Sequence, residues 1–124
     1  MKTKRYSINW YDWDVVVEID HDIVTDEKLH AINNFWTGAD DRLCVANESV
    51  LDAVLCSLAE RCFQLQIEYG YTTKGLIGLF SWTDPLGFGP QEGWPNMDGT
   101  DGFKLILVDT VTFSPGEMTV QVLA

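Results

Sequence analysis

The chain has 124 residues, of which 46% are hydrophobic and 22% charged, a composition that is typical of a globular protein and excludes a disordered one. Nineteen acidic residues against eight basic ones give a net charge of −11, whereas solubility alone needs a magnitude of only about 2 to 8 in a small domain. This excess of negative charge argues against direct binding to nucleic acid or to an anionic membrane, and it favours a basic partner.

The length predicts a single domain over residues 1–124. Residues 1–5 are basic, but no apolar run follows them, and no segment approaches the ~18 apolar residues that a membrane span needs. The three cysteines, Cys44, Cys56 and Cys62, lack the spacing of a disulfide framework or of a zinc site. We therefore expect a cytoplasmic protein whose thiols are reduced, small and buried.

The first predicted element is a β-hairpin. Apolar and polar residues alternate over 4–10 and again over 14–23, so the two segments are expected to pair around a tight turn. In the second strand, the alternation places Val17 in the core, and it places Glu18 and Asp20 in solvent.

Two helices and a shorter third one are predicted next. Thr25 and Ser49 are suitable N-caps for helices over 26–37 and 49–69. The second of these carries an apolar stripe and is long enough to cross a sheet. A short helix is expected over 73–82, where two glycines weaken it.

The last third of the chain begins with a segment rich in glycine and proline over 83–102, which is longer than most connections and therefore a candidate functional loop. An apolar strand over 103–108 is expected to begin a second hairpin over 103–122. The order of elements indicates an α+β fold, in which two to three helices cover one face of an antiparallel sheet built from two hairpins. Leu58, on the long helix, is expected to be buried in its core.

The segment Glu92–Gly102, with the sequence EGWPNMDGTDG, and the strand after it resemble a small family of uncharacterised bacterial and mobile-element proteins, known only as a domain of unknown function. The similarity extends to the overall length and the order of the elements. It implies a phage or other mobile-element origin, and it assigns neither an activity nor a catalytic residue.

The main candidate site is a row of carboxylates on the second strand. Asp14, Glu18 and Asp20 share one face of that strand, on which successive positions lie about 6.5 to 7 Å apart. Such a row resembles a track of phosphates, whereas the alternative is a solvated strand face that prevents aggregation. The predicted partner-binding residues are Asp12, Asp14, Glu18, Asp20, Asp22 and Phe88.

No cofactor, metal or catalytic residue is predicted. Asn96–Gly102 places oxygen ligands at alternate positions, but Leu107 occupies the place where a calcium loop needs a bidentate glutamate, so a turn with Asx-type hydrogen bonds is favoured. Neither His21 nor His30 has a partner in the sequence that would make it a general base.

We therefore predict a non-enzymatic interaction or inhibitor protein, encoded by a phage or mobile element. Its acidic face would block the basic surface of a nucleic-acid-binding protein or nuclease complex of host defence, as an inhibitor of the anti-CRISPR or anti-restriction type that mimics nucleic acid. Two alternatives stay open: a self-associating structural protein, such as a homodimer anchored by Phe88 and Trp94, and a small enzyme with a site under the 83–102 loop. A competing interpretation of Trp94 is a structural plug over the sheet edge.

Overall fold

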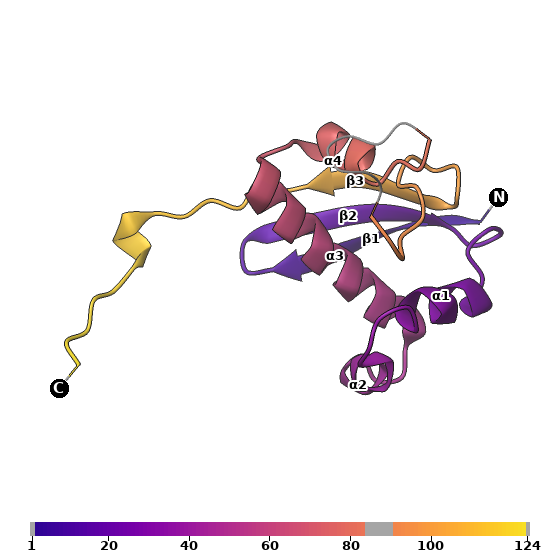
Figure 1. Cartoon of the computed structure of the whole chain (residues 1–124), viewed down its shortest axis with the longest axis horizontal. Helices are drawn as coiled ribbons and strands as arrows, with labels where there is room; N and C mark the ends of the chain where they lie inside the picture. The colour runs from indigo at the N-terminus through magenta and orange to yellow at the C-terminus, as the bar shows by residue number, and fades with distance from the viewer. Residues whose placement is uncertain (1, 84–90, 124) are drawn as a thin grey trace.

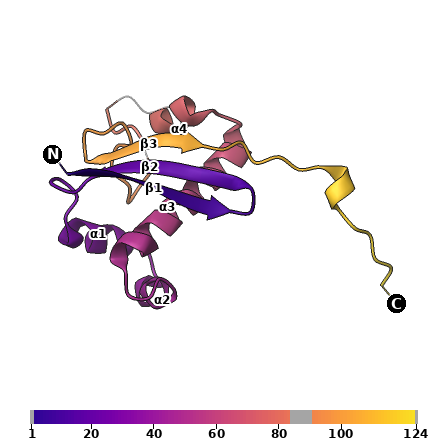
Figure 2. The ribbon, with the colours of Figure 1, turned by 180° about the vertical axis from the view of Figure 1, so that it is seen from behind.

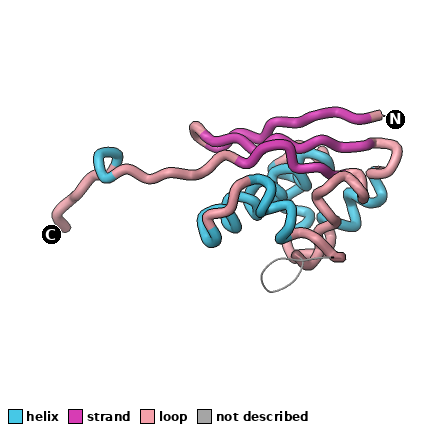
Figure 3. The backbone as a smooth tube through the Cα atoms, turned by 90° about the horizontal axis from the view of Figure 1, so that it is seen from above, coloured by secondary structure: helices cyan, strands magenta, loops and turns pink. Residues whose placement is uncertain are grey.

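The computed structural model describes residues 2–83 and 91–123 and has two layers. One layer is an antiparallel sheet of the strands β1 (Thr3–Trp10), β2 (Trp13–Asp20) and β3 (Phe103–Val108), in the order β1-β2-β3. The helices that follow β2 form the other layer and pack on one face of this sheet, and Figure 3 shows the opposite face without a helix over it. The predicted α+β fold, with helices on one face of an antiparallel sheet, is confirmed.

The helical layer is dominated by one long helix. α3 crosses the sheet diagonally, with the shorter helices at its two ends (Figure 1). The bounds of the helices are α1 Asp26–Asn33, α2 Ala39–Val45, α3 Val50–Tyr69, α4 Thr73–Leu79 and a short 3-10 helix η1 Pro115–Glu117.

The β1–β2 hairpin and its register are as the alternation predicts. Trp10 pairs with Trp13, so the turn has two residues, and Tyr11 takes the positive φ of 54° that such tight turns need. Val15, Val17 and Ile19 are fully buried. Since a slip of one residue would turn every side chain of β2 to the other face, the burial of Val17 confirms the register.

The long helix α3 has the N-cap and the buried apolar stripe that the sequence predicts. The Ser49 hydroxyl accepts a hydrogen bond from the Asp52 backbone N–H at 3.2 Å, and Gly70 ends the helix with a φ of 69°. Leu58, on the face toward the sheet, is fully buried, as expected. Thr25 caps α1 in the same way, through a bond from the Lys28 N–H at 3.3 Å.

Helix α2 was not predicted, and the first helix is shorter than predicted. α1 ends at Asn33 instead of residue 37, and Gly38 is the N-cap of α2 with a φ of 85°. None of the residues of α2 is buried, so its sequence lacks the apolar stripe from which a helix is recognised. The predicted third helix also ends early, at Leu79.

The predicted second hairpin is wrong. β3 forms and pairs with β2, but residues 109–123 contain no strand and run out from the body of the protein (Figures 1 and 2). The last anchored residue is Val111, whose N–H donates to the Gln66 side-chain oxygen at 3.0 Å. The alternation of apolar and polar residues along 118–122 shows only that this segment could form a strand. It does not pair with β3, because the edge of β3 is already bonded to another segment: the Leu105 N–H donates to the Met97 carbonyl at 3.1 Å.

The segment 91–102 packs against the helices and the edge of β3. Trp94 and Met97 are buried, and the rings of Trp94 and Trp36 lie 5.1 Å apart. Gly93 has a φ of 85°, and a Cβ there would come within 2.6 Å of the Trp36 ring, so only glycine allows this approach. The predicted Asx turn is present, because the Asp98 carboxylate accepts from the Thr100 N–H at 3.0 Å. That carboxylate also accepts from the Thr100 hydroxyl, and these bonds lower the Asp98 pKa.

The burial of Trp94 confirms its interpretation as a structural plug and predicts the effect of its removal. Trp94→Ala should lower the free energy of unfolding by about 3 to 5 kcal/mol, as other large-to-small core substitutions do. Phe88 lies outside the described residues, and the sequence predicts that Phe88→Ala melts like the wild type. Equilibrium denaturation of the two variants tests both statements, and a wild-type curve for Trp94→Ala would contradict the first.

Candidate functional site

The predicted acidic residues lie along β2 and at its two ends. Asp14, Glu18 and Asp20 alternate along β2 with the buried Val15, Val17 and Ile19, so they point away from the core. Figure 3 shows no helix over that face of the sheet. Asp12 lies in the hairpin turn and Asp22 in the turn after β2, and both are exposed. The sixth predicted residue, Phe88, lies outside the described residues.

Glu18, in the middle of the predicted row of carboxylates, is flanked by positive charge. The register places Arg5 of β1 opposite it on one side and Lys104 of β3 on the other. The Arg5 Nε lies 3.1 Å from the Glu18 Oε2, and the Glu18 side chain is only 25% exposed. Glu18 and Asp20 are thus half-buried rather than exposed, because β2 is the central strand and its neighbours cover both flanks.

The remaining carboxylates form two groups, one at each end of β2. At the hairpin end, the Asn9 side chain donates to the Asp14 carboxylate, and the Asp14 N–H donates to the Asp109 carboxylate at 2.8 Å. At the other end, the Asp22 N–H donates to the Asp20 carboxylate at 3.0 Å. The cations around Glu18 separate these groups, so the strand presents two acidic ends instead of a phosphate-like row.

The helical layer carries more of the negative charge. Residues 26–69 contain eight acidic and three basic residues, a net charge of −5. Three of those carboxylates, from Asp41, Asp52 and Glu60, line a cleft of about 490 Å³ between α2 and α3. Ala53 and the exposed side chain of Val45 line the same cleft. We call it the acidic cleft.

The exposed side of α3 extends this acidic surface. Asp52, Glu60 and Glu68 are exposed and follow one another at intervals of eight residues, with Cys56 and Gln64 between them. Residues four apart lie on the same face of a helix, so these five side chains form a single ridge. At 1.5 Å of rise per residue, its carboxylates are about 12 Å apart along the helix axis. We call these five residues the α3 ridge.

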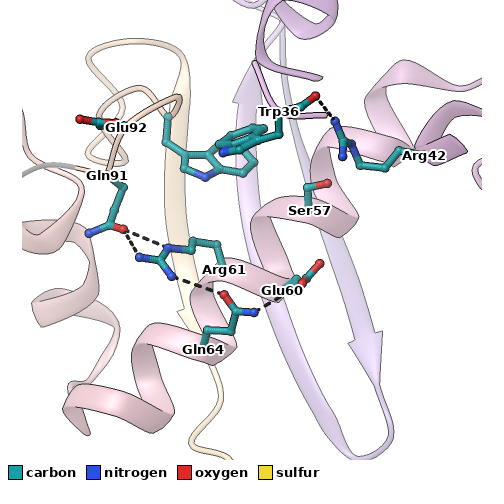
Figure 4. A pocket seen from close by; sticks show the side chains of 9 residues that line it. Trp36, Arg42, Ser57, Glu60, Arg61, Gln64, Gln91 and Glu92 are labelled. Carbon is teal, nitrogen blue, oxygen red and sulfur yellow. Dashed lines mark hydrogen bonds between the residues drawn. The ribbon is translucent and has the colours of Figure 1, made fainter. Parts of the chain in front are cut away.

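A second pocket adjoins the acidic cleft, with which it shares Arg42, Ser57 and Glu60, and is shown in Figure 4. It has a volume of about 460 Å³, and the paired rings of Trp36 and Trp94 form one wall. Arg61 donates to the Gln91 side-chain oxygen from Nε at 3.0 Å and from Nη2 at 2.5 Å. Its Nη1 donates to the Gln64 oxygen at 3.4 Å, so this guanidinium is used to hold the 91–94 segment against α3.

Arg42 lines both pockets and joins α1 to α2. Its guanidinium donates to the Asn33 side-chain oxygen at 2.9 Å, and to the carbonyls of Asn33 at 2.6 Å, Thr37 at 2.7 Å and Trp36 at 3.0 Å. These acceptors lie at the end of α1 and in the turn after it, where carbonyls lack helical partners. Sequence reasoning missed Arg42 and Arg61, because their acceptors are brought together only by the fold.

The Arg42 network predicts a large effect from a conservative change. Arg42→Lys keeps the charge but loses the planar set of donors, so it should destabilise the protein by about 1 to 3 kcal/mol. Chemical denaturation measures this loss. Arg42→Gln is the matched variant, and it should lower the free energy of unfolding by at least as much. Wild-type stability of Arg42→Lys would mean that charge alone suffices at this position.

The cysteines differ from the prediction that all three are buried. Cys62 is fully buried, but Cys44 and Cys56 are exposed, because α2 buries no side chain and Cys56 lies on the α3 ridge. Burial raises the pKa of Cys62 to about 12, and partial burial together with the nearby Asp52 carboxylate raises that of Cys56. Within residues 2–83 and 91–123, no three His, Cys, Asp or Glu side chains gather closely enough to hold a metal ion.

The Cys62 pKa predicts how stability changes in alkaline solution. The unfolded chain loses the thiol proton near pH 9.0, whereas the folded chain keeps it up to about pH 12. The contribution of Cys62 is therefore fully present below pH ~9 and is lost between pH ~9 and ~12, with a slope of at most about 1.4 kcal/mol per pH unit. Denaturation curves across this range test it. Cys62→Ala should lack this part of the slope, and equal slopes in the two proteins would contradict the prediction.

Comparison with known proteins assigns the chain to a family. Residues 14–120 match the family described as protein of unknown function (DUF2528). The chain belongs to this family. It is 42% identical over 121 residues to protein ea10 of Escherichia phage lambda and to the lambda prophage-derived protein ea10 of Escherichia coli O6:H1, with 95% of each chain covered. The predicted resemblance to an uncharacterised mobile-element family is confirmed, and the chain is a member of a phage-derived family of unknown function.

No solved structure matches the chain. None of the helices in the described ranges has the length and apolar character needed to span a membrane.

Proposed function

We propose that this protein is a non-enzymatic inhibitor that binds the basic, nucleic-acid-binding surface of a host protein. The observation that carries the proposal is the acidic cleft together with the α3 ridge, which concentrate exposed carboxylates on one side of the helical layer. Complementary charge speeds the encounter of two proteins and selects the partner. Occupation of the basic surface would then exclude nucleic acid by competition.

The acidic cleft has the chemistry that receives a lysine or arginine side chain. Such side chains lay their methylene groups on apolar surface and keep the charged end among polar groups. Val45 and Ala53 offer the apolar surface, and the carboxylates of Asp41, Asp52 and Glu60 surround it. The cation that also lines the cleft, Arg42, already donates to the end of α1, so it does not neutralise these three groups by pairing with them.

The two acidic ends of β2 are the second surface for this function. Asp12 and Asp14 lie at one end and Asp20 and Asp22 at the other. Because Arg5 and Lys104 lower the negative potential between them, this face fits a basic partner less well than the helical side does. The relatives are proteins of phage lambda and of a lambda prophage, and this origin supports a role against a host protein.

Charge reversal tests the proposal. The double variant Asp52→Lys/Glu60→Lys should lose the capture of its partner from an Escherichia coli lysate, whereas Asp12→Lys/Asp22→Lys, at the ends of β2, should keep most of it. All four residues are exposed, so melting temperatures should stay close to that of the wild type. Capture should also weaken as salt rises to physiological levels, where charges are screened over about 8 Å.

The captured protein must itself bind nucleic acid, and the wild type must displace that nucleic acid in a binding assay with the purified partner. A captured protein without nucleic-acid binding would contradict the inhibitor function. Capture that survives both double variants would contradict the role of the carboxylates. Loss of capture in Asp12→Lys/Asp22→Lys alone would mean that the partner binds the sheet and not the helical side.

A further inference from the structure

The outer edge of β1 is the part of the sheet whose backbone groups have the fewest hydrogen-bond partners among the described strands. β1 pairs with β2 on one side, and none of the described strands pairs with its other side. An edge strand has a row of backbone N–H and C=O groups that point outward and can bond to another strand. β1 is eight residues long, so a strand of six residues fits along it.

An apolar groove lies directly beneath this edge. It has a volume of about 330 Å³, and its walls come from β1 (Ile8, Trp10) and from α3 (Ala59, Phe63, Ile67). Trp10 remains 43% exposed and Ile67 50% exposed, although both belong to the side of the sheet that the helices cover. A further strand beside β1 would place every second side chain in this groove.

The C-terminal segment Met118–Leu123 has the sequence such a strand would need. Met118, Val120 and Val122 alternate with Thr119 and Gln121, and no residue of the segment is charged. Val120 is 97% exposed and Val122 92% exposed, since the segment extends away from the body in every view (Figures 1, 2 and 3). A β-prone segment with its apolar face in water is the complement of an apolar groove beside a free strand edge.

We propose that Met118–Leu123 of one copy of the chain pairs with β1 of a second copy and fills its groove with Met118, Val120 and Val122. Thr119 and Gln121 then join the open face of the sheet, beside the polar side chains of β1. If each copy donates its segment to the other, the two groove sites are filled and the assembly closes as a symmetric dimer.

Charge supports a second copy as the occupant. Two chains with a net charge of −11 repel each other, but residues 2–11 contain three bases and no acid. Residues 109–123 contain two acids and no base, so Glu117, which directly precedes the uncharged donated segment, would approach a region of opposite charge. The family match extends to residue 120, so half of the donated segment, Met118–Val120, lies within the shared part of the family.

The direction of the chain after Val111 also favours pairing with a second copy over folding back onto β1 of the same copy. The chain is held at Val111 by the Gln66 side chain at 3.0 Å, and from there it leads outward from the body. The segment Thr112–Leu123 is exposed throughout and is therefore free to reach another molecule.

Cross-linking to Cys56 tests the proposal, because this exposed thiol already lines the groove. In a Cys44→Ser background, Val120→Cys should form a disulfide with Cys56 of the other copy and give a covalent dimer under oxidising conditions. Gln121→Cys, which points to the open face, is the matched control and should cross-link much less, since two cysteines whose Cβ atoms point apart cannot form a disulfide. An internal disulfide in a monomer would mean that the segment folds back, and would overturn the exchange. Equal cross-linking of both variants would overturn the pairing.

Oligomeric state gives an independent readout on the full chain by sedimentation equilibrium. The wild type should be a dimer. Val120→Pro, which removes a strand donor, and Ile67→Glu, which places a charge in the groove, should each raise the dimer dissociation constant at least about tenfold. Val45→Glu, which changes an exposed apolar side chain outside the groove, should stay dimeric. A monomeric wild type, or a dimer that both groove variants leave unchanged, would overturn the proposal without bearing on the inhibitor function.

Discussion

The burial of one face of β2 is the constraint on which the rest of the structure depends. Val15, Val17 and Ile19 are fully buried and belong to the same apolar cluster as Leu58 of α3. This packing fixes the register of the central strand, because a slip of one residue would expose all three side chains. The register in turn decides which residues of β1 and β3 lie opposite each carboxylate. The core therefore determines the electrostatics of the face that it does not touch.

The sequence is a good guide where a local pattern and a buried partner agree. The hairpin, the caps at Thr25 and Ser49, the apolar stripe of α3 and the burial of Trp94 were all predictable for this reason. Helix α2 has no such pattern, since it buries none of its side chains. The segment 118–122 has the pattern of a strand, but the edge of β3 that it would need is occupied by residues 97–99. Alternation reports a tendency to pair, and the partner depends on which edges the fold leaves free.

The charges of the candidate site also depend on contacts that a local sequence pattern does not show. A row of acids within one strand is visible in the sequence, but Lys104, which lies opposite Glu18, is 86 residues away along the chain. The acidic cleft could not be predicted from the sequence, because Asp41 belongs to α2, a helix that has no apolar pattern. Net charge of −11 predicts that an acidic surface exists. Its position follows only from the way that the helices bring their carboxylates together.

The proposed contacts meet at the α3 ridge. Cys56 and Glu60 line both the acidic cleft and the apolar groove under β1, so a basic partner and a donated strand would lie against the same helix. Two ligands that share neighbouring side chains change each other's affinity by the same factor in both directions. Burial of the groove would lower the exposure of Glu60 to water and strengthen its attraction to a cation in the cleft. Self-association would then strengthen the binding of the basic partner without being required for it, and the partner would in turn stabilise the paired form.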